Sequence, residues 1–166
     1  AYLRVVVNPR DDISLRRILN YPPRGIGDTT VERVNRLRLI KDVSLHDALH
    51  HADSLADIPE SARRSAKDLL TALSDARAEF ERGRNYTSAA ATLFERVGLK
   101  TVLLSNDDPQ GARRWENVQF LLRSIERFEG RSSEDRPTLA QFLARITLRK
   151  DDQGEEREAL PNQVTL

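Results

Sequence analysis

The apolar pattern of residues 59 to 82 restricts the fold of this chain more than any other feature. Apolar side chains recur there three and four residues apart, which places them on one face of a helix: Leu69, Leu70, Leu73, Ala76 and Phe80. Pro59 sits at a first-turn position and opens this helix, and Gly83 ends it. The pattern predicts the longest helix of an all-α fold.

The rest of the chain has the same helical spacing, interrupted by proline, glycine and polar residues. Asn8-Pro9 stops the first segment, Ser44 and Thr87 are predicted caps, and Gly98 closes the segment that Thr87 opens. Helices are predicted over 1–8, 12–20, 29–42, 44–52, 59–82, 87–98, 99–104, 110–128 and 138–150. The fold class is therefore predicted to be a compact, all-α, multi-helix domain that covers residues 1–150.

Residues 151–166 differ from this domain in composition. Residues 151–158 are mostly acidic and contain no apolar side chain, which predicts a flexible linker. The last residues have strand character without a partner strand, so we expect them to fray.

Composition excludes several classes of protein. Apolar residues make up 39% of the 166, charged residues 32% and aromatic residues 5%, and no apolar run approaches the ~20 residues of a membrane span. We therefore expect no membrane partner. There is no cysteine, which excludes disulfides and thiolate metal sites and is compatible with a reducing cytoplasm. No signal peptide is visible, and the missing initial methionine indicates a piece of a longer or processed chain.

A Gly-x-Gly sequence at residues 25–27 is the most specific motif. Gly25 and Gly27 permit positive φ angles and have no Cβ to block a ligand, so backbone N–H groups can face an anion. Asp28, Thr29 or Thr30 is predicted to cap the helix that follows. The N-terminus of that helix favours a phosphate oxygen. The alternative is a tight turn between two helices with no ligand.

Local charge favours the phosphate interpretation. Arg24 and Arg33 flank the motif, and residues 1–41 carry nine Arg or Lys against four acids, a net charge of +5 where the whole chain has +1. Apolar helices enter and leave the motif, a helix-hairpin-helix layout typical of modules that bind the nucleic-acid backbone. Asp28 opposes this interpretation, since a carboxylate beside an anion site repels the ligand.

Several segments together resemble a known family. They are Ala1-Tyr2-Leu3-Arg4, Asn8-Pro9-Arg10-Asp11-Asp12, Arg17-Ile18-Leu19-Asn20, Pro23-Arg24-Gly25-Ile26-Gly27, Thr29-Thr30, Arg114-Trp115-Glu116-Asn117 and Gln163-Val164-Thr165-Leu166. This chain resembles the 2B subdomain of superfamily 1 DNA helicases of the UvrD, PcrA and Rep type. The resemblance is strong over residues 1–41, moderate over 109–166 and loose over 42–108.

The resemblance implies an accessory subdomain of an ATP-dependent 3'-5' DNA helicase. In that family the 2B subdomain swivels between two orientations and places its Gly-Ile-Gly loop on the duplex ahead of the fork. Carried over by position, the DNA-binding residues are Arg24, Gly25, Ile26, Gly27, Thr29 and Thr30, to which local charge adds Arg33. The implied partners are double-stranded DNA or a single-strand/double-strand junction, and the helicase motor domains. The implied location is the bacterial cytoplasm, associated with the nucleoid.

We expect no catalysis by this chain alone. No Gly-x-x-x-x-Gly-Lys-Ser/Thr sequence is present to hold ATP phosphates, so we expect no cofactor here, and the resemblance assigns ATP and magnesium to the parent helicase. His46 and His50 have metal-ligand spacing without an evident third ligand. Trp115 is interpreted as core or interface packing rather than base stacking.

A second function stays open from the sequence. The leucine-rich helices at 59–82 and 110–128 could dock a protein partner, which would make the domain a protein-interaction or autoinhibitory module of the same helicase without direct DNA contact.

Overall fold

The computed structural model describes residues 1–52, 57–105, 109–130 and 138–147, and every regular element in these residues is helical. The helices are α1 (Tyr2–Val7), α2 (Asp12–Leu19), α3 (Asp28–Lys41), α4 (Leu45–His50), α5 (Glu60–Glu81), α6 (Tyr86–Arg96), α7 (Leu99–Leu103) and α8 (Gly111–Glu129), followed by a helix over residues 139–147. The predicted all-α class is confirmed. The predicted acidic linker and strand at 151–166 lie outside the described residues. Among the described helices, none combines the length and hydropathy that a membrane span needs.

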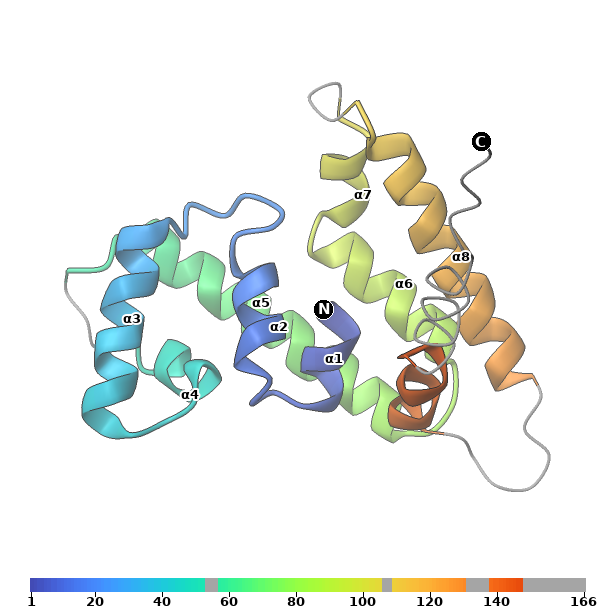
Figure 1. The fold of residues 1–166 in the computed structure, drawn as a ribbon, viewed down its shortest axis with the longest axis horizontal. Helices are drawn as coiled ribbons and strands as arrows, with labels where there is room; N and C mark the ends of the chain where they lie inside the picture. Colours follow the sequence, from blue (N-terminus) through green and yellow to red (C-terminus); the bar gives the residue numbers. More distant parts are fainter. Residues whose placement is uncertain (53–56, 106–108, 131–137, 148–166) are drawn as a thin grey trace, which may run out of the picture.

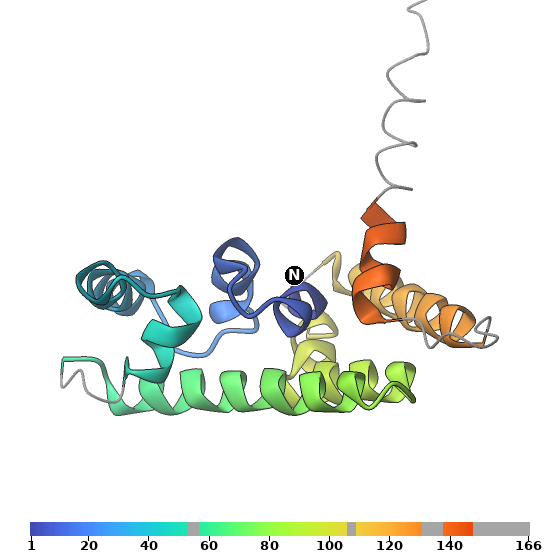
Figure 2. The ribbon, with the colours of Figure 1, turned by 90° about the horizontal axis from the view of Figure 1, so that it is seen from below.

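Helix α5 is the base on which the other helices lie (Figure 2). Helices α1 to α4 form a group along α5, which we call the N-terminal lobe, residues 1–52; α3 and α4 lie at the first part of α5, and α1 lies further along it (Figure 1). Helices α6 to α8 form the C-terminal lobe, residues 86–130. The predicted apolar face of α5 is buried, including Leu69, Leu70 and Leu73. These leucines are therefore not available to dock a partner, contrary to one of our expectations.

The two lobes share one core. Leu15 and Val34 fill it in the N-terminal lobe, and Leu93 and Ile125 fill it in the C-terminal lobe. The ring of Tyr2 in α1 meets the ring of Phe94 in α6 edge to face, with 6.3 Å between centroids. The domain is thus continuous from lobe to lobe.

Polar side chains set the starts of α2, α4 and α6. Asp11 accepts a hydrogen bond from the N–H of Ser14 at the start of α2, and Ser44 accepts one from the N–H of Asp47 at the start of α4, as predicted for Ser44. The predicted Thr87 cap is wrong, because α6 begins at Tyr86 and Asn85 is its N-cap. Its first N–H groups bond instead to the Glu129 carboxylate at the end of α8, at 2.9 Å from the Tyr86 nitrogen.

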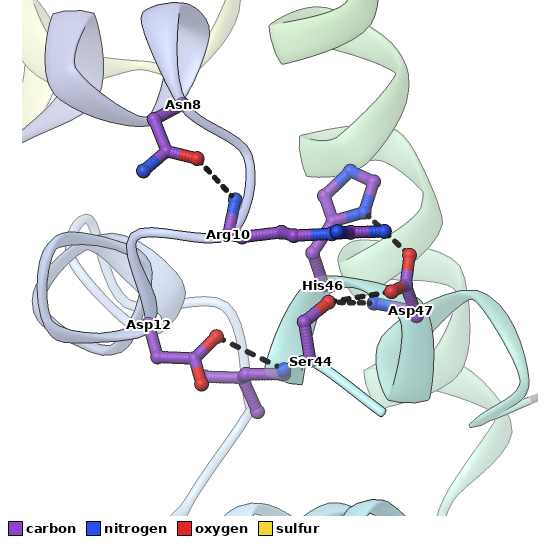
Figure 3. A network of polar contacts seen from close by, with 7 residues as sticks. Asn8, Arg10, Asp12, Ser44, His46 and Asp47 are labelled. Carbon is purple, nitrogen blue, oxygen red and sulfur yellow. Dashed lines mark hydrogen bonds and ion pairs between the residues drawn. The ribbon is translucent and has the colours of Figure 1, made fainter. Parts of the chain in front are cut away.

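Asp12 ties three helices of the N-terminal lobe together. One carboxylate oxygen accepts a hydrogen bond from the N–H of Leu45 in α4 at 3.0 Å, and the other lies 2.9 Å from the guanidinium of Arg38 in α3. Figure 3 shows the bond from the Leu45 N–H to Asp12 beside the network of Ser44, His46 and Asp47. The orientation of α3 relative to α2 is therefore fixed at the end of α3 that lies away from the Gly-x-Gly motif.

Candidate nucleic-acid interface

The Gly-x-Gly motif lies in the connection 20–27 between α2 and α3. Gly25 adopts the left-handed region with φ 70°, whereas Gly27 has φ −78° and ψ 177°, extended backbone open to any residue. The expectation of a positive φ is therefore right for Gly25 and wrong for Gly27. A Cβ added at either glycine would meet no atom within 4 Å, so both face open space.

Helix α3 begins without a side-chain cap. Gly27 is the N-cap and no side chain bonds to the first turn, so the prediction that Asp28, Thr29 or Thr30 is the cap is wrong. The physical reason is that Gly27 already has the extended geometry of an N-cap, and its carbonyl accepts hydrogen bonds from the N–H groups of Thr30 and Val31. Asp28 and Thr29 thus fall inside the first turn.

Backbone donors remain unused around this helix start. Among the described residues, no partner is present for the N–H groups of Gly25, Gly27, Asp28 and Thr29, and all four residues are exposed. Unpaired N–H groups at the positive end of a helix dipole are suited to an anion. The loop therefore has the chemistry that the phosphate interpretation requires.

Arg24 is used inside the fold. Its guanidinium donates hydrogen bonds to the carbonyl oxygens of Ile18, Pro22 and Val97 at 3.0, 2.8 and 3.1 Å, and to the Tyr2 hydroxyl at 2.9 Å. The sequence predicts that this guanidinium contacts a phosphate, whereas in the structure it bonds to backbone carbonyl groups. It still adds a positive charge behind the loop.

Two more of the seven predicted DNA-binding residues point into the protein. The side chain of Ile26 is 1% exposed and anchors the loop in the core, and its N–H donates to the Asn20 carboxamide at 3.3 Å. Thr30 is also buried. These residues support the loop, while Gly25, Gly27 and Thr29 form its exposed surface.

Arg33 lies on α3 and is paired. Its Nε is 3.3 Å from a carboxylate oxygen of Asp57, and its guanidinium also donates to the Asp57 carbonyl oxygen. The pair is solvent-exposed, so the charge is only partly neutralised. Arg33 therefore stabilises the segment around Asp57, just before α5. It contributes less to an anion site than its position in the sequence indicates.

Other cations next to the loop were not singled out from the sequence. Arg16 and Arg17 form the last turn of α2, directly before the loop, and both are exposed. Arg36 is exposed on α3, and among the described residues the structure gives no ion pair to these three arginines. The signal in the sequence was the place of Arg16 and Arg17 in the helix turn before a glycine loop.

The histidines of α4 form a polar cluster. The His46 and His50 rings lie 4.7 Å apart, and the His46 Nδ1 is 3.4 Å from an Asp47 carboxylate oxygen. Figure 3 shows the Arg10 side chain extending towards His46 and Asp47. Within the described residues, no group of three His, Cys, Asp or Glu side chains is arranged to hold a metal ion.

The fold and the loop together define a class of protein. It is an all-α domain that presents free backbone donors from one glycine loop at a helix N-terminus. The chain belongs to the UvrD-like helicase C-terminal domain family, whose sequence model matches residues 1–166.

Curated relatives agree with this family. The chain is 29% identical over 170 residues to the ATP-dependent DNA helicase PcrA of Bacillus subtilis, which covers 100% of this chain and 22% of that protein. It is 27% identical over 168 residues to PcrA of Staphylococcus aureus strain Mu50, with 100% of this chain and 22% of that protein covered. For PcrA of Staphylococcus epidermidis the identity is 26% over 151 residues, with 91% and 20% covered. The chain thus spans about a fifth of the length of the curated relatives it matches.

Proposed function

We propose that this domain is the 2B subdomain of an ATP-dependent 3'-5' DNA helicase, which contacts the duplex backbone near the fork and swivels to regulate unwinding. The observation that carries the proposal is that the N–H groups of Gly25, Gly27, Asp28 and Thr29 have no partner within the part of the chain that the structure describes. Membership of the UvrD-like helicase C-terminal domain family supports it, as do relatives that are named ATP-dependent DNA helicases.

The proposed contact is electrostatic and reads no base. Phosphate oxygens accept hydrogen bonds from the Gly25 and Gly27 amides, and the dipole of α3 favours the negative charge. Arg16 and Arg17 add full positive charge beside the loop. Backbone donors meet the same phosphate on every sequence, so binding is independent of sequence and weakens steeply with salt.

The proposed reaction belongs to the parent protein. ATP and magnesium would be bound by motor domains outside this chain, which lacks a Walker-type loop. Double-stranded DNA or a single-strand/double-strand junction would be the nucleic-acid partner. The motor domains would be the protein partner, in the bacterial cytoplasm at the nucleoid.

A second candidate function rests on exposed apolar side chains. Leu39 and Ile40 on α3 are 80% and 76% exposed, and Phe120 on α8 is 60% exposed. Such residues would suit a protein-interaction or autoinhibitory module of the same helicase without direct DNA contact. This function predicts no binding of duplex by the chain alone.

Titration of a labelled duplex with the chain and with Gly27→Val tests the first function. The extended backbone at Gly27 accepts valine without strain, and the added side chain fills the space in front of the free amides. We expect binding roughly tenfold weaker, as for a lost hydrogen bond to a charged group, with any loss of helicity confined to the start of α3, where valine is a poorer N-cap than glycine.

The matched control is Gly130→Ala at the end of α8, where an added Cβ would meet only the Glu126 carbonyl oxygen at 3.5 Å. This variant should bind duplex as the wild-type chain does. Equal affinity of Gly27→Val and the wild-type chain would remove the loop from the mechanism.

A further inference from the structure

We propose that Arg24 is a positioning residue, which acts with Tyr2 and Asn20 as a clamp that holds the Gly25–Gly27 loop with its free amides outward, and that it does not itself touch a phosphate. The effect on DNA rests on the proposed function above. The clamp itself is defined by hydrogen bonds within the fold.

The guanidinium of Arg24 has no terminal donor left for a ligand. Nη1 donates to the carbonyl oxygens of Ile18 and Pro22, and Nη2 donates to the Tyr2 hydroxyl and to the Val97 carbonyl oxygen. Each terminal nitrogen carries two N–H bonds, so all four are in use. A phosphate could reach Arg24 at these atoms only by displacing bonds that hold the loop.

Electrostatics explain why an arginine occupies this position. Ile18 lies in the last turn of α2, and Val97 is the C-cap of α6. The last carbonyl groups of a helix lack partners within the helix and form the negative end of its dipole. Arg24 neutralises two such ends at once, which the compact ammonium group of lysine cannot do with the same geometry.

Tyr2 extends the clamp to α1. Its hydroxyl accepts a hydrogen bond from Arg24 and donates one to the carbonyl oxygen of Tyr21, at the start of the loop. Burial raises the pKa of the Tyr2 hydroxyl, against the opposing effect of Arg24, so the group keeps its proton for the bond to Tyr21. Tyr2 thus connects the guanidinium with the backbone of the loop.

Asn20 holds the loop on both sides of Gly25. Its carboxamide oxygen accepts hydrogen bonds from the N–H groups of Arg24 and Ile26 at 2.7 and 3.3 Å. The N–H of Gly25 between them has no partner in the described residues, and Gly25 is exposed. The clamp therefore consumes the flanking donors and leaves the Gly25 amide for a ligand.

The bond from Arg24 to Val97 also joins the loop to the C-terminal lobe. Val97 lies 73 residues further along the chain, at the end of α6. A shift of α6 relative to α2 would change the same guanidinium contacts that orient the loop.

Two variants that keep the charge test the clamp: Tyr2→Phe, which removes only a hydroxyl, and Arg24→Lys. If Arg24 is a positioning residue, we expect duplex binding by Tyr2→Phe to weaken roughly three- to tenfold and by Arg24→Lys about tenfold or more. The slope of log K against log salt should not change, because no phosphate-neutralising charge is lost. Amide hydrogen exchange at Ile26 should become faster in both.

The matched control is Tyr21→Phe, which removes an exposed hydroxyl beside the loop and keeps the backbone carbonyl that Tyr2 uses. This control should bind as the wild-type chain does. Should either clamp variant fail to fold, Asn20→Leu removes the second support and should give the same faster Ile26 exchange and weaker binding with helicity retained.

The outcomes separate the two proposals. Wild-type affinity in Tyr2→Phe and Arg24→Lys would overturn the clamp and leave the proposed function standing. A salt slope lowered by about one in Arg24→Ala, with no effect of Tyr2→Phe, would make Arg24 a direct phosphate contact. A wild-type chain that does not bind duplex at low salt would overturn the proposed function and the effect of the clamp on DNA with it.

Discussion

The N-terminal and C-terminal lobes share one apolar core and differ in the polar contacts that join their elements. In the N-terminal lobe, α3 is the longest helix with 14 residues, and directed polar contacts from Asp12, Asn20 and Arg24 bind the helices to one another and to the loop. Towards the C-terminal lobe, aromatic pairs add to an aliphatic core. Phe80 and Tyr86 lie 5.6 Å apart, and Phe128 and Phe142 lie 5.2 Å apart.

The difference in polar contacts follows from the irregular loop 20–27, which lies in the N-terminal lobe. Regular helices satisfy their own backbone and pack through apolar faces, whereas an irregular loop needs partners for its backbone groups. The loop 20–27 therefore draws polar side chains into its lobe. This comparison predicts that apolar truncation will affect both lobes alike and that polar substitutions will separate them.

Truncation of a core leucine should have the largest effect. Leu93→Ala removes a side chain that is 2% exposed, and we expect a loss of about 2–5 kcal/mol in the free energy of unfolding in urea. Leu15→Ala in the other lobe should cost a similar amount, and the exposed Leu39→Ala close to nothing. Two separate unfolding transitions in either core variant would show that the lobes do not share one core.

Removal of the Asp12 carboxylate should come next. Asp12→Ala leaves the Leu45 N–H and the Arg38 guanidinium without their partner, and we expect a loss of about 1–3 kcal/mol. The same measurement on Asp28→Ala, which removes an exposed carboxylate, serves as the control. Equal losses of stability in the two variants would contradict the claim that the Asp12 contacts stabilise the N-terminal lobe.

Glu129→Ala tests a polar contact between α6 and α8. The carboxylate takes the place of a local cap for Tyr86 and Thr87, so we expect a loss of about 1 kcal/mol. Glu126→Ala, also on α8 but exposed, should be neutral. A loss larger than that of Asp12→Ala would mean that polar contacts stabilise the C-terminal lobe more than the N-terminal lobe, contrary to the comparison.

Acid should weaken the N-terminal lobe, because all three histidines of the chain lie in residues 46–51. Partial desolvation of its ring, and then the charge of His46, lowers the pKa of His50 from its ordinary value of 6.5. The unfolded chain therefore binds more protons here, so stability present above pH 6.5 is lost as the pH falls through the lowered pKa.

Since His50 is exposed, this effect should be the smallest of the four. Thermal unfolding between pH 7.5 and 5.5 should show the loss, and His50→Gln should reduce it. Asp11 and Asp47, whose pKa values are lowered by hydrogen bonds from Ser14 and Ser44, act only at lower pH, below their ordinary value of 3.8.

Local sequence signals predicted the helices well where the boundary is set locally. Ser44, Pro59, Gly83 and Gly98 stand within one or two residues of the helix ends that they were expected to mark. The start of α6 was missed because Glu129, which bonds to its first N–H groups, lies 43 residues away from Tyr86. No local pattern contains such a contact.

The candidate site followed the same rule. The position of the Gly25–Gly27 loop and its exposure could be predicted from the motif, but the role of Arg24 could not. Its partners Tyr2 and Val97 lie 22 and 73 residues away, and only the tertiary fold brings them to one guanidinium. In the sequence, an arginine beside a glycine loop looks like a ligand contact. The sequence does not show whether carbonyl groups of the fold already bind its guanidinium.

The uncapped start of α3 has a kinetic consequence. Its N–H donors, which have no partner among the described residues, lie at the surface, so an anion can exchange with solvent there without any movement of the helix. Occupancy should then adjust rapidly, and dissolved inorganic phosphate or sulfate should compete for the same amides. The proposed contact with a DNA backbone would then form and break quickly.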